Sequence, residues 1–79
     1  MHINVYSLKE VLFQDEVESL NVKSIDGELT ILEHHIPLIT ELKRGPIKII
    51  DKNGKVHILN ASAGFLEVNP KEVNVLCQE

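Results

Sequence analysis

The sequence predicts an all-β fold, an antiparallel β-sandwich of two sheets with about ten short strands. Three observations support this prediction. Apolar and polar residues alternate with a period of two in short runs, turn-forming residues separate these runs at regular intervals, and no run shows a helical period. A chain of 79 residues has one small core at most, so residues 1–79 are expected to form a single domain.

Each expected strand is a short alternating or apolar run. The first places Ile3 and Val5 on one face, and the run 17–25 places Val17 opposite Leu20. The expected strands are residues 2–7, 11–13, 17–25, 29–32, 38–43, 47–51, 55–60, 64–68 and 72–76.

Glycine and proline mark the connections between these strands. Asp26–Gly27 and Asn53–Gly54 are tight-turn signals, because Gly adopts the positive φ that such turns need. Arg44–Pro46 and Asn69–Lys71 separate the later strands. Pro37 has no amide hydrogen to donate to a strand ladder, so the segment around it is expected in a loop or at a strand end.

The composition excludes several classes of function. The chain has 12 acidic and 8 basic residues, and its lysines are scattered, so a nucleic-acid partner is not expected. No basic leader and no stretch of about 18 apolar residues occurs, so neither secretion nor membrane insertion is expected. Cys77 is the single cysteine, which indicates a reducing compartment, and its alternating surroundings predict a buried thiol.

The segment Glu33-His34-His35 is the one cluster with metal-binding or acid–base side chains close together. Adjacent residues of an extended chain point to opposite faces, so His34 and His35 could not both bind one ion there. A small metal-dependent hydrolase built on Glu33, His35 and His57 remains an alternative. We nevertheless expect no catalytic residue, metal or cofactor, because the isolated glycines form no phosphate-binding loop and no nucleophile motif occurs.

A family resemblance extends over nearly the whole chain. Residues 27–40, GELTILEHHIPLIT, resemble the GELGI-x-PGHAPLLT signature of the epsilon subunit of F-type ATP synthases. Residues 42–45, 63–71 and 73–76 resemble its I/L-K-P-G, GG-[FI]-LEV-x-P and V-T-V-L segments. The positions that match the first signature are Gly27, Glu28, Leu29, Ile31, His35, Pro37, Leu38 and Thr40.

The resemblance implies a non-catalytic rotor subunit of the central stalk. Such a β-sandwich binds the gamma subunit and the polar loops of the c-ring, and so couples ion translocation to ATP synthesis. By position in the signature, Ser7, His35 and Thr40 would contact gamma, and Glu28, on the loop after Asp26–Gly27, would contact the c-ring. The implied location is peripheral, on the cytoplasmic face of a bacterial inner membrane. A free-standing β-sandwich adaptor for another complex is the alternative.

The sequence departs from the family at three places. Glu33–His34 replaces Pro-Gly before the motif histidine, which predicts an altered loop. Ala63 replaces the first of two glycines. The C-terminal helical hairpin of longer relatives is not expected after residue 79, and neither is its nucleotide binding. One exposed apolar patch is expected on the gamma-facing sheet, close to His35 and Thr40, because exposed apolar patches of this kind mark interfaces.

Overall fold

The computed structural model describes residues 1–78, which form eight β-strands. The strands are β1 (His2–Tyr6), β2 (Val11–Ser24), β3 (Gly27–Leu32), β4 (Leu38–Leu42), β5 (Gly45–Asp51), β6 (Val56–Ala61), β7 (Ala63–Val68) and β8 (Glu72–Gln78). The predicted all-β sandwich is therefore confirmed, with eight strands in place of about ten. Nothing in the described range forms a helix that could span a membrane.

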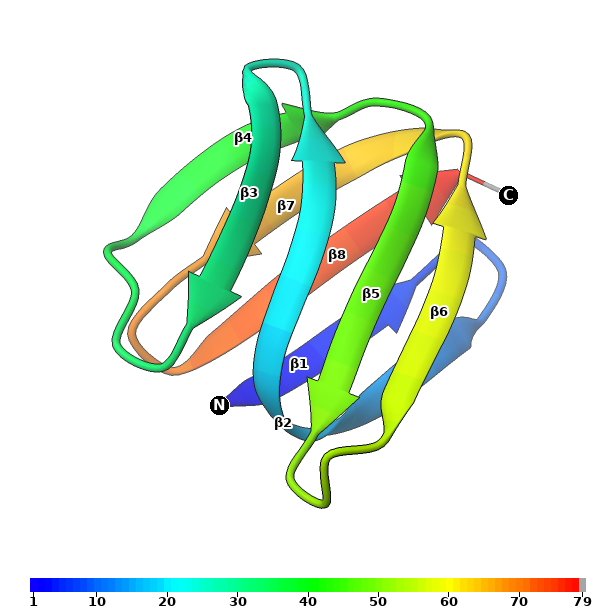
Figure 1. Cartoon of the computed structure of the whole chain (residues 1–79). Coiled ribbons are helices and arrows are strands. Elements are labelled where there is room, and N and C mark those ends of the chain that lie inside the picture. The colour runs from blue at the N-terminus through cyan, green and yellow to red at the C-terminus, as the bar shows by residue number, and fades with distance from the viewer. Residues whose placement is uncertain (79) are drawn as a thin grey trace.

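The strands form two layers that face each other (Figure 1). The front layer has the order β3–β2–β5–β6, and the back layer has the order β4–β7–β8–β1–β2. Strand β1 pairs with β8 in parallel, whereas its pairing with β2 and the other strand pairings of the described range are antiparallel. The first and last strands therefore lie side by side in the back layer.

Strand β2 belongs to both layers. Its first half pairs with β1, and its second half pairs with β3 and β5. The register against β5 shifts after Val17, so Glu18 is an extra, exposed residue of a β-bulge. This bulge turns Val17 to the same side as Leu20 and Val22, and all three are fully buried. Residues 11–13 and 17–25 were expected to form two separate strands, with Val17 on the opposite face from Leu20. That prediction is wrong, because β2 is one strand and strict alternation fails at its bulge.

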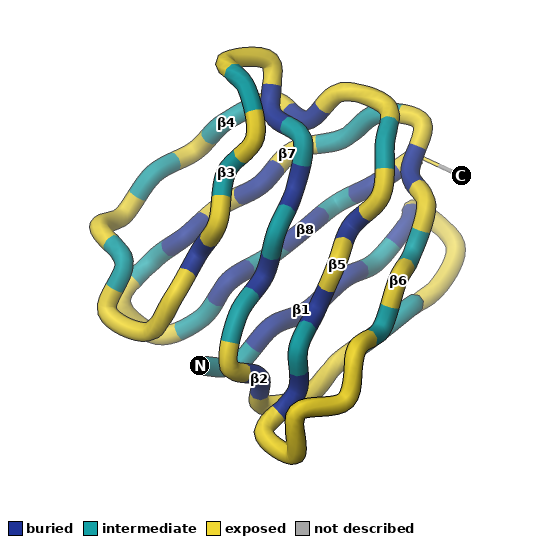
Figure 2. The backbone as a smooth tube through the Cα atoms, viewed as in Figure 1, coloured by how far each residue is buried: buried dark blue, intermediate teal, exposed yellow. Residues whose placement is uncertain are grey.

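Buried residues, dark blue in Figure 2, occur in both layers, and the core that they form is almost entirely aliphatic. The fully buried large side chains are Ile3, Val5, Val17, Leu20, Val22, Ile31, Ile49, Leu66 and Val75. Cys77 also packs into this core, as its alternating surroundings predicted. The inner faces of both layers are thus occupied, and interaction surfaces must lie on the outer faces, edges and loops.

Candidate subunit-binding surface

The β3–β4 loop carries His35, the motif histidine of the sequence. Pro37 immediately precedes β4, so the segment lies in a loop as predicted. The amide of His35 donates to the carbonyl oxygen of Leu32 over 3.1 Å, and its Nδ1 lies 2.9 Å from the carbonyl oxygen of Ile36. These local hydrogen bonds hold the imidazole at the surface, where it is half-buried.

The other residues of the alternative metal site have partners elsewhere. The Met1 ammonium donates to Glu33 Oε2 over 2.6 Å and is the main cause that lowers the pKa of this carboxyl group. His57 instead lies 2.9 Å from Asp51 Oδ2 and packs against the Phe13 ring at 5.0 Å. Within residues 1–78, no three His, Cys, Asp or Glu side chains are grouped as metal ligands. Glu33, His35 and His57 therefore do not assemble into the site that a hydrolase would need.

Two exposed aliphatic side chains flank the motif residues. Ile36 is 73% exposed beside His35, and Ile39 is 75% exposed beside Thr40. This confirms the expectation of exposed aliphatic side chains near His35 and Thr40. Thr40 itself alternates with Ile39 and shares the inner side of β4 with the buried Leu42, so Ile39 is the residue that β4 presents outward.

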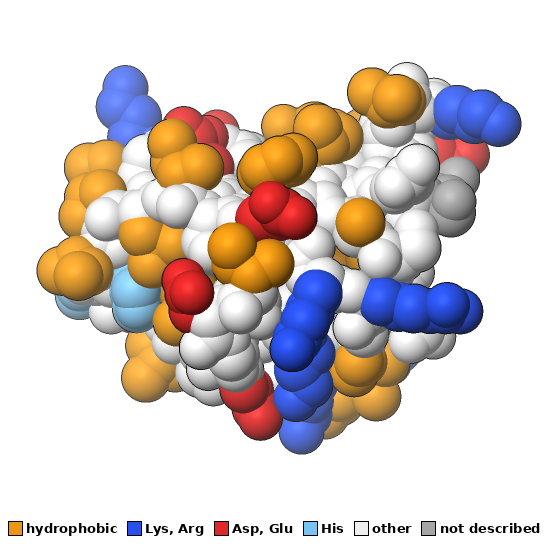
Figure 3. Space-filling view, turned by 90° about the horizontal axis from the view of Figure 1, so that it is seen from above, with side chains coloured by type: hydrophobic (Ala, Val, Ile, Leu, Met, Phe, Trp, Pro, Cys, Tyr) orange, Lys and Arg blue, Asp and Glu red, His pale blue; other side chains and the backbone are white. Residues whose placement is uncertain are grey.

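Exposed apolar side chains are not confined to this one patch. Figure 3, a view from above, shows hydrophobic side chains at several places on that face, with charged side chains between them. Val56 and Ile58 are exposed on β6, in the other layer, and Ile58 reaches 61% exposure. The expectation of a single patch is therefore wrong, because a chain this small has more apolar side chains than its core can hold.

Ser7 lies at the opposite end of the back layer from His35. It follows the end of β1, whereas His35 precedes the start of β4, and the pairings through β8 and β7 make these two strands run in the same direction. The Ser7 hydroxyl accepts hydrogen bonds from the amides of Lys9 and Glu10, at 3.2 and 3.3 Å. Ser7 thus closes the β1–β2 turn and is buried, and the structure does not bring it together with His35.

Glu28 is the second residue of β3, on the outer face of the front layer, and not in the preceding loop as expected. The difference arises because pairing with β2 continues down to Gly27, which has a φ of +120°. Glu28 accepts hydrogen bonds from Asn21 over 2.9 Å and from Lys23 over 3.1 Å. Asn21, and then Lys23, lower the pKa of Glu28, so its carboxylate is charged and already paired.

Comparison with known proteins identifies the family. The model of the ATP synthase delta/epsilon chain β-sandwich domain matches residues 1–79. The chain belongs to this family. It is 45% identical over 76 residues to the ATP synthase epsilon chain of Acinetobacter baumannii (strain SDF), which covers 96% of this chain and 55% of that relative. This epsilon-type domain therefore spans about half the length of its curated relative.

Solved structures show the same fold. A chain in the cryo-EM structure of the Euglena gracilis mitochondrial ATP synthase, described as OSCP/F1/c-ring, matches with a TM-score of 0.91 at 23% identity, over 98% of this chain and 49% of that one. A chain of the Tetrahymena thermophila mitochondrial ATP synthase central stalk/c-ring matches with a TM-score of 0.82 at 16% identity, over 100% of this chain and 63% of that one. At these identities, the likeness supports the epsilon-type fold.

The structure shows the consequences of two positions at which this chain departs from the epsilon-type sequence pattern. His34 stands where the signature has Gly, and its φ is +64°, a left-handed conformation that Gly adopts at lower cost. The loop thus has the backbone of a glycine position without the glycine. Ala63, by contrast, is half-buried, whereas a Cβ on the next residue, Gly64, would overlap the carbonyl oxygen of Leu76. The second glycine of the pair is therefore the one that the packing requires.

Proposed function

We propose that this domain is the stalk-binding part of a non-catalytic ATP synthase rotor subunit. In this role it binds the gamma subunit and rests on the polar loops of the c-ring, coupling ion translocation to ATP synthesis. The epsilon chain of Acinetobacter baumannii, at 45% identity, supports the assignment. The location that follows is peripheral, on the cytoplasmic face of a bacterial inner membrane.

The exposed aliphatic side chains around His35 carry the gamma-binding part of the proposal. Ile36 and Ile39 project from consecutive parts of the β3–β4 loop and β4, next to His35 and Thr40. Exposing each large aliphatic side chain costs about 1.5–3 kcal/mol relative to burial. A partner that covers them recovers this free energy, and His35 would then lie within or beside the covered area, whereas Ser7 would be reached only by a partner that extends to the opposite end of the back layer.

Contact with the c-ring would involve the other layer. Glu28 lies on the outer face of the front layer, and Ile25, in the adjoining β2–β3 turn, is exposed. The Glu28 carboxylate is already paired with Lys23, so its additional attraction to a polar loop would be weak and would fall with ionic strength. This contact is accordingly proposed as a rim interaction.

Co-purification of gamma with the intact, tagged protein tests the proposal. Ile39→Glu should reduce the recovered gamma strongly, because it places a charge where an apolar side chain is covered. Ile58→Glu, at a similarly exposed position on the front layer, is the matched control for Ile39→Glu. Glu28→Lys should leave gamma recovery unchanged and weaken retention of the c-ring. Absence of gamma with the unmodified protein, or equal recovery with Ile39→Glu and Ile58→Glu, would contradict the gamma assignment.

A further inference from the structure

The outer face of the back layer carries a row of apolar side chains that crosses four strands. Strand register pairs Phe65 of β7 with Leu76 of β8, Leu76 with Tyr6 of β1, and Tyr6 with Val11 of β2. Phe65 and Val11 are exposed, and the two residues between them are half-buried. Since paired residues point to the same face, these four side chains form one continuous strip, the apolar row.

A polar row runs beside the apolar row. Asn74 donates to Glu67 over 3.1 Å, Asn4 donates to Asn74 over 2.9 Å, and Gln14 donates to Asn4 over 2.7 Å. Asn4 is only 9% exposed although it points away from the core. Because these amides are already bonded to one another, a partner can cover the face without leaving them unpaired.

A pocket of about 390 Å³ opens beside Phe65 and Leu76 of the apolar row, against the β1–β2 turn. Phe65 and Leu76 form its apolar side, and Ser7, Leu8 and Lys9 form the other wall. Leu8 is 94% exposed, the highest value among the exposed large apolar side chains of the described residues, and so adds apolar surface beside the pocket. The pocket is large enough for an aliphatic or aromatic side chain of a partner.

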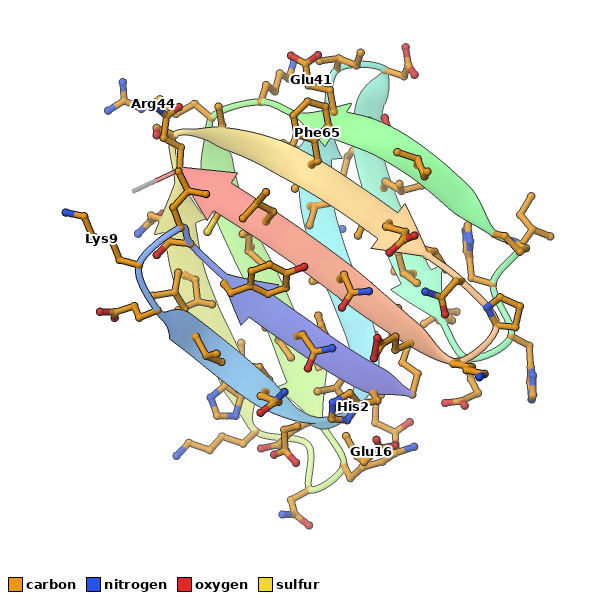
Figure 4. The ribbon with its side chains drawn as sticks, turned by 180° about the vertical axis from the view of Figure 1, so that it is seen from behind. His2, Lys9, Glu16, Glu41, Arg44 and Phe65 are labelled. Carbon is orange, nitrogen blue, oxygen red and sulfur yellow. The ribbon has the colours of Figure 1, made fainter. Side chains whose placement is uncertain are left out.

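Free positive charge lies around this pocket. Lys9 lines it, and Figure 4 shows Arg44 at the same end of the back layer. Neither forms an ion pair with another residue in 1–78. A cation without an ion-pair partner in the wall of an apolar pocket, Lys9, favours a partner segment that carries a carboxylate next to its apolar side chain.

The pocket is continuous with the surface proposed to bind gamma. On the outer face, Ile39 pairs with Glu67 and Glu41 pairs with Phe65, which makes Ile39 and Phe65 diagonal neighbours at roughly 7–8 Å. Apolar side chains that are exposed or half-buried thus extend from Ile39 through Phe65 and Leu76 to Leu8. A single partner can cover this whole path.

We propose that gamma docks on this outer face and inserts one apolar side chain, with a neighbouring carboxylate, into the pocket between Phe65 and the β1–β2 turn. The inference rests on the proposed function and identifies the pocket that would hold the inserted gamma side chain, here called the anchor. Phe65 and Leu76 bind the inserted side chain, and Lys9 pairs with the carboxylate. The polar row, whose side chains are already hydrogen-bonded to one another, lies beside the inserted side chain. Lys9 at the rim contributes to the rate of association more than to affinity.

Titration of the intact chain into a purified ATP synthase core from the same organism, containing gamma and stripped of this chain, tests the anchor. Phe65→Glu should raise the Kd by at least ~30-fold, as expected for a central contact residue. Ile58→Glu, the same class of change at a similarly exposed site on the front layer, should change Kd less than ~3-fold. Lys9→Glu should slow association and reduce its dependence on salt. Circular dichroism checks that each variant keeps its fold.

The outcomes separate this inference from the proposed function. If the unmodified chain binds and Phe65→Glu binds equally well, or if Ile58→Glu is the weaker of the two, the anchor is wrong while gamma binding stands. If the unmodified chain does not bind, both fail. Self-association of the chain that Phe65→Glu abolishes, without an effect on core binding, would assign the face to a second copy and overturn the anchor.

Discussion

The β5–β6 and β3–β4 loops both contain a left-handed residue, but they hold it differently. In the β5–β6 loop the residue is Gly54, with φ of +83°, and Asp51 Oδ1 accepts the amides of Asn53 and Lys55, each over 2.9 Å. In the β3–β4 loop the residue is His34, with φ of +64°. In the β5–β6 loop the positive-φ position is occupied by glycine, which adopts this conformation at low cost. In the β3–β4 loop it is occupied by a histidine, for which the same conformation costs more.

The difference distinguishes a purely structural loop from one next to the surface proposed to bind gamma. The β3–β4 loop presents His35 and the exposed Ile36, and Glu33 ties it to the Met1 ammonium and lies 3.9 Å from Lys52 of the neighbouring loop. Strained backbone persists where the surrounding structure holds it, and such residues gather at functional sites. The strain at His34 is thus consistent with a loop held in shape for a partner.

The largest expected effect comes from replacing the glycine at the positive-φ position of the β5–β6 loop with a β-branched residue. A Cβ at Gly54 meets no atom within 4 Å, so Gly54→Val tests the backbone alone. It should destabilise the domain by about 2 kcal/mol, because a β-branched residue is poorly accommodated at positive φ. Lys55→Val, at the next exposed position, is the control and should change stability by less than ~0.5 kcal/mol in urea unfolding. Equal effects would show that the loop does not constrain φ.

A second, smaller effect concerns the carboxylate that closes the β5–β6 loop. His57, and then the Lys55 and Asn53 amides, hold the pKa of Asp51 below its ordinary value of 3.8. A depressed folded pKa stabilises the native state above the ordinary value, and this contribution is lost as pH falls through the folded pKa. Asp51→Asn should therefore lower stability at pH 7 and flatten the stability curve below about pH 4.

Thermal unfolding across this pH range measures the effect. His57→Gln removes the main cause of the shift, so its loss of stability in acid should be smaller and should end at a higher pH than in the unmodified protein. An unchanged acid limb in Asp51→Asn would show that Asp51 does not close the loop electrostatically.

The two loops also show what the sequence could predict. The turns at Gly27 and Gly54 were predictable because a glycine between alternating runs has a local mechanism, and both have positive φ. The contact of Glu33 with Met1 was not, since it joins residues 32 positions apart whose proximity depends on the complete sheet. Local alternation likewise missed the bulge in β2, because an extra residue is visible only against its partner strand.

Placement of the candidate contacts had the same limit. Pro37 located the His35 segment correctly in a loop, and the exposed Ile36 and Ile39 were expected as a class. Phe65 and its pocket were missed, since the apolar row exists only through the register of β7, β8, β1 and β2. Single-strand patterns show which residues face outward, but they do not show which strands those residues will meet.

The smallest expected effect is a stabilising one, and it comes from placing glycine at the positive-φ position of the β3–β4 loop. His34→Gly relieves a left-handed conformation that costs a non-glycine residue roughly 1–2 kcal/mol, but it adds unfolded-state entropy worth about 0.5–1 kcal/mol. The net gain should be about 0.5 kcal/mol in urea unfolding. His35→Gly, the matched control, removes the Nδ1 contact with Ile36 without relieving positive φ, so it should destabilise. If both substitutions destabilise equally, the positive φ of the β3–β4 loop carries no conformational strain. The two loops would then differ only in which residue occupies the positive-φ position.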